Sequence, residues 1–175
     1  MIRYDRAGST CAAGDQPGTQ KLLQLLLDRY PGTRSSGIHN CRNVGGSKAL
    51  SLHGEGRAVD IRPASRAQGD AIAAWALANA SALNIQEIIW YRRIWSAVYP
   101  NKGWRDYHGV NPHVDHVHIG QNWLGAGGSP GGGTNTSKGT SEGISVVGWL
   151  ILLTGAVGIY LAYQDSTEES RTEKD

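Results

Sequence analysis

The sequence predicts an α+β domain with a small, mostly antiparallel sheet and packed helices, followed by a flexible linker and one transmembrane helix. Three observations carry this prediction. Hydrophobic patterns up to residue 124 alternate as helix, strand, strand, helix and then several strands. Residues 125–143 are rich in Gly, Ser and Thr, and residues 144–163 carry no charge.

The sequence predicts one helix and two short strands in the first half of the domain. Residues 19–30 form an apolar helical face, with Thr19 as the expected cap and Pro31-Gly32 as the stop. A short strand is expected over residues 33–38, and a glycine-containing loop over residues 40–50. Another strand starts near Arg57 and ends at Pro63.

The second half adds a helix and three more strands. Residues 65–83 are rich in Ala with apolar residues at helical spacing. The strands are expected over residues 85–91, 94–98 and 114–119, with a polar, turn-rich segment over residues 99–112.

Four segments follow from this pattern: a domain over residues 1–124, a linker over 125–143, a membrane helix over 144–163 and a charged tail over 164–175. Twenty apolar residues are long enough to cross a bilayer. Basic residues in the tail favour a single-pass protein whose large domain lies outside. Thr154, Gly158 and Ala162 share one face of small residues, which could pair two such helices in a homo-oligomer.

Composition limits the partners. The net charge is only +2, so nothing indicates a nucleic-acid ligand or a metal-dependent nuclease. No apolar run follows Arg3 and Arg6, so no cleavable secretory signal is expected at the start of the sequence. The two cysteines, Cys11 and Cys41, are compatible with one disulfide or with two free thiols.

Two segments concentrate metal-ligating side chains. His53 and Asp60 lie seven residues apart with two glycines between them. Residues 113–118 hold three of the six histidines and one aspartate. Imidazole and carboxylate groups are the ligands of a zinc ion that keeps an open position for water. We therefore predict that His53, Asp60 and His118 bind Zn²⁺.

Hydrolysis at such a site also needs a base. In a strand, His116 and His118 project to the same face, which makes His116 one candidate, and Asp115 is the other. His113 is a candidate to hydrogen-bond the developing oxyanion. The sequence leaves these roles open, and it places Glu55 and Arg57 as solvated loop residues.

The signature Ser51-x-His53-x-x-Gly56-x-Ala58-x-Asp60 resembles that of the D-Ala-D-Ala carboxypeptidase/endopeptidase zinc metallopeptidases, which share the VanY-type, LAS and hedgehog-type fold. His116-x-His118 is similar to the H-x-H of that superfamily. The resemblance implies His53, Asp60 and His118 as zinc ligands. It implies either Asp115 or the pair His116 and His113 around the base, and an upstream arginine that holds the substrate, for which Arg42 and Arg34 are candidates.

The resemblance leads us to expect a membrane-anchored zinc peptidase that cuts peptidoglycan stems or cross-links and faces the cell wall. Phage lysis and wall remodelling are both compatible with it. A zinc-stabilised module that binds wall peptides without cutting them is the alternative. A base beside the ligands distinguishes the two, because a binding module does not need one.

Overall fold

The computed structural model describes residues 1–128. The membrane helix and charged tail predicted from the sequence lie outside these residues, as does the linker beyond residue 128. Within residues 1–128, no helix is both long enough and apolar enough to cross a bilayer.

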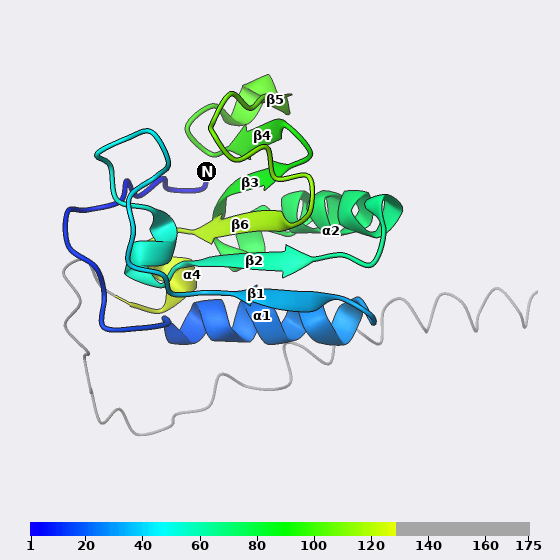
Figure 1. Cartoon of the computed structure of the whole chain (residues 1–175), viewed down its shortest axis with the longest axis horizontal. Helices are drawn as coiled ribbons and strands as arrows, with labels where there is room; N and C mark the ends of the chain where they lie inside the picture. The colour runs from blue at the N-terminus through cyan, green and yellow to red at the C-terminus, as the bar shows by residue number, and fades with distance from the viewer. Residues whose placement is uncertain (129–175) are drawn as a thin grey trace, which may run out of the picture. The chain divides into compact units, whose positions relative to one another are not determined.

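The α+β prediction is confirmed: six strands form one sheet in which every neighbouring pair is antiparallel (Figure 1). The sheet order is β1-β2-β6-β3-β4-β5, which places β6, the last strand within residues 1–128, between β2 and β3. The strands are β1 (Arg34–Gly37), β2 (Ala58–Arg62), β3 (Ile85–Trp90), β4 (Arg93–Ser96), β5 (Arg105–Asp106) and β6 (Val117–Gln121).

The helices differ from the expectation mainly at their ends. Helix α1 (Pro17–Arg29) begins two residues before Thr19, which is buried inside the helix, so the predicted cap is wrong. Proline fits the first turn because its missing N–H has no partner there in any case. The expected helix over residues 65–83 is interrupted at Asn79 and splits into α2 (Arg66–Ala78) and α3 (Ala80–Leu83). Helix α4 (Trp123–Ala126) ends two residues beyond the predicted domain boundary.

The two faces of the sheet have different roles. Apolar side chains of the central strands, such as Val59, Ile119 and Ile88, pack with residues of α1 and α2 in the hydrophobic core. Because side chains alternate between faces, Asp60 and His118 point away from this core. Their strands pair so that Asp60 lies directly opposite His118. The sheet therefore brings these two predicted metal ligands together.

A buried ion pair fixes the chain around this sheet. Arg57 is completely buried, and its Nε donates to Glu55 Oε2 at 2.7 Å. Its Nη1 donates to the carbonyl of Gln121, and its Nη2 to the carbonyl of Asp5. The expectation of solvated loop residues at positions 55 and 57 is wrong, because this pair joins the N-terminal segment to β6. A buried guanidinium needs such a set of acceptors.

The two cysteines form a disulfide, which settles the alternative that the sequence left open. Cys11 and Cys41 lie 30 residues apart in the sequence, with Cα atoms 5.6 Å apart. The bond ties the N-terminal segment to the loop that follows β1. Disulfides of this kind are typical of proteins that work outside the reducing cytoplasm.

We expect the double variant Cys11→Ser/Cys41→Ser to have a free energy of unfolding about 3–4 kcal/mol lower than the oxidised protein, from the entropy of a closed loop of this length. Urea denaturation of both proteins, and of the wild type in reductant, measures this. The reduced wild type serves as the control and should match the variant. Equal unfolding midpoints for the oxidised protein and the variant would contradict a stabilising role.

Candidate metal centre

A capped turn holds His53 in place. Residues Leu52–Glu55 form a short 3₁₀ helix whose preceding residue, Ser51, accepts a hydrogen bond from the backbone N–H of His53. Gly56 ends this turn with φ +68°, and a Cβ there would lie 2.1 Å from the carbonyl oxygen of Gly14. The serine and glycine of the sequence signature thus shape the backbone around the histidine.

Three ligand atoms meet on the face of the sheet opposite the helices. His53 Nε2 lies 3.1 Å from His118 Nδ1 and 3.1 Å from Asp60 Oδ1. His118 Nδ1 lies 3.0 Å from the same carboxylate oxygen. His53, Asp60 and His118 are also the group that could hold a metal ion within residues 1–128. The structure therefore brings together the three predicted ligands, from η1 (Leu52–Glu55), β2 and β6.

His53 and His118 each use one ring nitrogen for a hydrogen bond to a group outside the three ligands. These bonds determine which ring nitrogen carries the lone pair. His53 Nδ1–H donates to the carbonyl of Ile38 at 2.6 Å. His118 Nε2–H donates to Glu87 Oε1 at 3.2 Å. In neutral imidazoles, the remaining nitrogens, His53 Nε2 and His118 Nδ1, then carry lone pairs directed at each other. Three acceptors this close repel one another unless a metal ion or a proton lies between them.

A zinc ion fits this donor set. Zn–N and Zn–O bonds of about 2.0–2.1 Å in a tetrahedron place neighbouring ligand atoms about 3.3–3.4 Å apart. The observed separations of 3.0–3.1 Å are slightly shorter. Two imidazoles and one carboxylate also leave the fourth position free, as catalytic zinc sites do. The outer ring nitrogens of the two histidines donate to the carbonyl of Ile38 and the carboxylate of Glu87, which are the usual kinds of partner for zinc-bound imidazoles.

His116 lies beside the three ligands and is oriented by Asp115. Its Nδ1–H donates to Asp115 Oδ1 at 2.7 Å, and its Nε2 lies 3.7 Å from Asp60 Oδ2. Asp115 also pairs with Arg62 at 3.2 Å. The hydrogen bond from His116, and its positive charge when protonated, lower the pKa of the Asp115 carboxyl against the smaller opposing effect of burial. A base of this kind is weak, so the geometry favours His116 as proton acceptor and Asp115 as its partner.

His113 completes the histidine cluster from a strained backbone. Its φ is +50°, which is uncommon outside glycine, and its ring centroid lies 4.8 Å from that of His116. Its Nδ1–H donates to the carbonyl of Asn111 at 2.7 Å. Burial, aided by the charges of His118 and His116, lowers the pKa of His113 to about 4. A neutral ring in this tautomer offers Nε2 as a hydrogen-bond acceptor. This disfavours the predicted role of His113 as a hydrogen-bond donor to the oxyanion.

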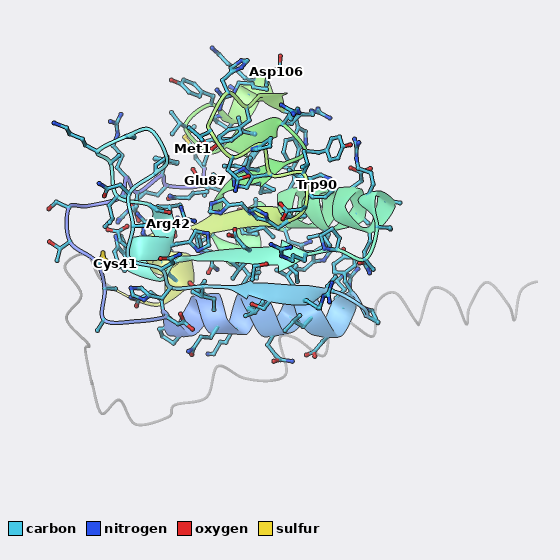
Figure 2. All side chains as sticks on the ribbon, viewed as in Figure 1. Met1, Cys41, Arg42, Glu87, Trp90 and Asp106 are labelled. Atoms are coloured by element: carbon cyan, nitrogen blue, oxygen red, sulfur yellow. A yellow bond between two sulfur atoms is a disulfide. The ribbon has the colours of Figure 1, made fainter. Side chains whose placement is uncertain are left out.

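A cleft of about 610 Å³ opens beside the ligands, and its lining includes His53, His118 and His113. Arg42 and Arg6 also line the cleft. Arg34 lies instead on β1, opposite Arg62 and outside the cleft lining. Figure 2 labels Arg42 close to Cys41, near one end of the sheet. Of the two predicted substrate-binding arginines, only Arg42 lies near the metal centre.

A family model of the VldE C-terminal domain matches residues 11–118. The chain belongs to the VldE C-terminal domain family. The match contains all three ligands and the cluster from His113 to His116. Searches of curated proteins and of solved structures found no match. The similarity of the sequence to the D-Ala-D-Ala metallopeptidases thus rests on the motifs alone.

The segment matched to the VldE C-terminal domain also contains a site residue that the sequence analysis missed. Glu87 lies on β3, lines the cleft and accepts the hydrogen bond from His118. The signal was present in the sequence, because Glu87 places a carboxylate in the strand Ile85–Trp90, whose other residues are apolar except for Gln86. A charged group in a central strand needs a partner.

In the protein without metal, the two carboxylates Asp60 and Glu87 favour a proton on His118. Burial is the largest effect on His118 and lowers its pKa, but hydrogen bonds and charges from Asp60 and Glu87 outweigh it and raise the pKa to about 9. The pKa values of the Asp60 and Glu87 carboxyls are lowered by His118, again against the larger single effect of burial. A proton on His118 therefore supplies the positive charge that a metal ion would otherwise supply.

We expect the metal-free protein to be most stable near pH 6.5. The contribution of His118 is complete below its unfolded pKa of about 6.5 and is lost as the pH rises through about 9. The pKa of His113 is about 4 in the folded protein, below its unfolded value of about 6.5. Between these pH values the unfolded chain binds more protons at His113, so the free energy of unfolding also falls as the pH drops from 6.5 to 4. Urea unfolding of chelator-treated protein between pH 4 and 10 measures this. His118→Ala should lose the alkaline decline, and an unchanged decline would contradict the assignment.

Proposed function

We propose that the protein is a zinc-dependent peptidase that hydrolyses peptide bonds in bacterial peptidoglycan. The observation that carries the proposal is the meeting of His53 Nε2, Asp60 Oδ1 and His118 Nδ1 within 3.1 Å beside a large cleft. The sequence signature around His53 and Asp60 and the H-x-H at His116 and His118 support the peptidase assignment through their resemblance to zinc metallopeptidases.

A zinc ion bound by these ligands would lower the pKa of a water molecule to about 7 and polarise the peptide carbonyl. His116 then accepts the proton of the attacking water at Nε2, and Asp115 stabilises the resulting imidazolium at Nδ1. The same proton passes from His116 Nε2 to the nitrogen of the leaving amine. His113 is a poorer proton acceptor, because burial lowers its pKa to about 4.

The cleft suits a peptide with a carboxylate and small apolar side chains. Arg42 supplies a guanidinium on its wall, a group that binds carboxylate or carbonyl oxygens. Val44, Val98 and Val110 line the same cleft and are exposed. An arginine together with apolar walls favours a substrate such as the alanine-containing stem peptides of the wall. We further propose that residues 144–163 anchor this domain in a membrane facing the wall, as a single-pass protein.

Digestion of purified peptidoglycan by the zinc-loaded protein tests this function. We expect new amino termini, which mass spectrometry of the released fragments locates at one type of peptide bond. The chelator-treated protein is the control and should release none. A protein that sediments with peptidoglycan but creates no amino termini would instead be the zinc-stabilised binding module.

A further inference from the structure

We propose that Glu87, held by Tyr4 of the N-terminal segment, is a positioning residue of the metal centre that orients His118 through its outer ring nitrogen. The inference rests on the zinc site of the proposed function but not on peptide hydrolysis. Glu87 contacts the outer nitrogen of His118 and none of the three ligand atoms.

The fold places Glu87 where it can reach only one ligand. Residue 87 pairs with Gly120 on β6, two positions after His118 on the same face of the sheet. From there Glu87 Oε1 accepts the hydrogen bond of His118 Nε2–H at 3.2 Å. The side chains are 16% and 7% exposed, so this pair is shielded from bulk water. A shielded carboxylate has a much stronger influence on its partner than an exposed one.

Gly120 gives Glu87 the room to lie across β6. A Cβ at position 120 would come within 3.0 Å of Glu87 Cγ and within 2.5 Å of Leu52 Cδ1. A side chain at position 120 would therefore crowd Glu87 and displace the end of the Leu52 side chain. The glycine therefore belongs to the same arrangement as the carboxylate.

The second oxygen of Glu87 is held by the N-terminal segment. Tyr4 Oη–H donates to Glu87 Oε2 at 3.4 Å. The next residue, Asp5, exchanges two hydrogen bonds with Gln86: its N–H donates to Oε1 at 2.8 Å, and its carbonyl accepts from Nε2 at 3.0 Å. Figure 2 shows Glu87 on the side of the sheet along which the N-terminal segment runs.

Residues 1–10 precede the region matched by the VldE family model, yet they supply this contact to the metal centre. The two hydrogen bonds between the Asp5 backbone and Gln86 hold the neighbouring Tyr4 next to Glu87. The N-terminal segment is thus part of the site rather than an extension of the domain.

This chain of contacts has a defined chemical effect. By accepting from Nε2–H, Glu87 keeps the lone pair of a neutral His118 on Nδ1, the atom that faces His53 and Asp60. Its negative charge also increases the electron density that the imidazole can donate to an ion. Loss of such an outer partner typically weakens metal binding 10–100-fold.

The test measures zinc affinity of the full-length chain by competition with a chromophoric chelator. We expect Glu87→Ala to bind zinc about 10–100-fold more weakly than the wild type. Glu87→Gln keeps an oxygen that accepts from His118 but loses the charge, so it should recover part of this loss. Tyr4→Phe should weaken binding less than Glu87→Ala does. Asp106→Asn, which removes an exposed carboxylate from β5, is the control and should bind as the wild type does.

Visible absorption of the cobalt-substituted proteins gives a second readout, because its bands report ligand geometry rather than overall stability. Glu87→Ala should shift or weaken these bands, and Glu87→Gln should largely restore them. Wild-type affinity and spectra in both Glu87 variants would overturn the inference while leaving the peptidase proposal intact. Weakened zinc binding in a protein that cleaves no peptidoglycan would support the inference and reject the peptidase. A wild type that binds no zinc would overturn both.

Discussion

We expect His118→Ala to lose measurable peptide hydrolysis and to bind zinc at least about 100-fold more weakly than the wild type. His118 is one of the three ligands: its Nδ1 lies 3.0 Å from Asp60 Oδ1 and 3.1 Å from His53 Nε2. Removing it leaves two protein ligands, which rarely hold zinc in a catalytic site. Metal analysis of the dialysed protein, together with the release of amino termini from peptidoglycan, measures both effects.

His108→Ala is the matched control for this variant. His108 is an exposed histidine outside the cleft lining, so its loss removes one imidazole without touching the site. It should retain zinc and activity. If His118→Ala kept its zinc, or if metal-free wild type still cleaved the substrate, the proposed chemistry would be wrong.

The second large effect is expected for His116→Gln, which should lower kcat about 10²–10⁴-fold while zinc stays bound. Glutamine is of similar size but cannot accept a proton at neutral pH. The three ligand atoms do not include His116, so metal binding should persist. Steady-state kinetics on a soluble stem peptide, with zinc content determined for the same samples, provides the measurement.

Asp115→Asn separates the two candidate bases. Asp115 contacts His116 Nδ1 at 2.7 Å and is itself half exposed, so its loss should reduce kcat less than the loss of His116 does. The reverse order, with Asp115→Asn the more damaging change, would identify the aspartate as the base and contradict our assignment.

Much of the metal centre followed from the sequence because its geometry is local. Ser51, His53 and Gly56 belong to one capped turn, and Asp60 and His118 alternate with core residues such as Val59 and Ile119 in their strands. The strand period alone predicts that these ligands face away from the core. Pairing of the two strands then brings the ligands together.

The missed features depend on contacts between distant parts of the chain. Burial of Arg57 requires hydrogen bonds to the carbonyl groups of Gln121 and Asp5, and no local sequence pattern indicates these contacts. The contact of Glu87 with His118 depends on the pairing of β3 with β6. Strand β6 also begins at Val117 rather than at residue 114, and His113 in the segment before it has a positive φ. Periodicity does not report such a conformation.

X-ray absorption at the zinc edge of the zinc-loaded, full-length protein tests the central claim most directly. We predict one zinc ion per chain, bound by two imidazole nitrogens and one carboxylate oxygen at about 2.0–2.2 Å, with one further light ligand. In His118→Ala, no more than one imidazole, that of His53, should still contribute to the signal. A spectrum with sulfur ligands, with six oxygen ligands, or with no imidazole contribution would contradict a site built from His53, Asp60 and His118.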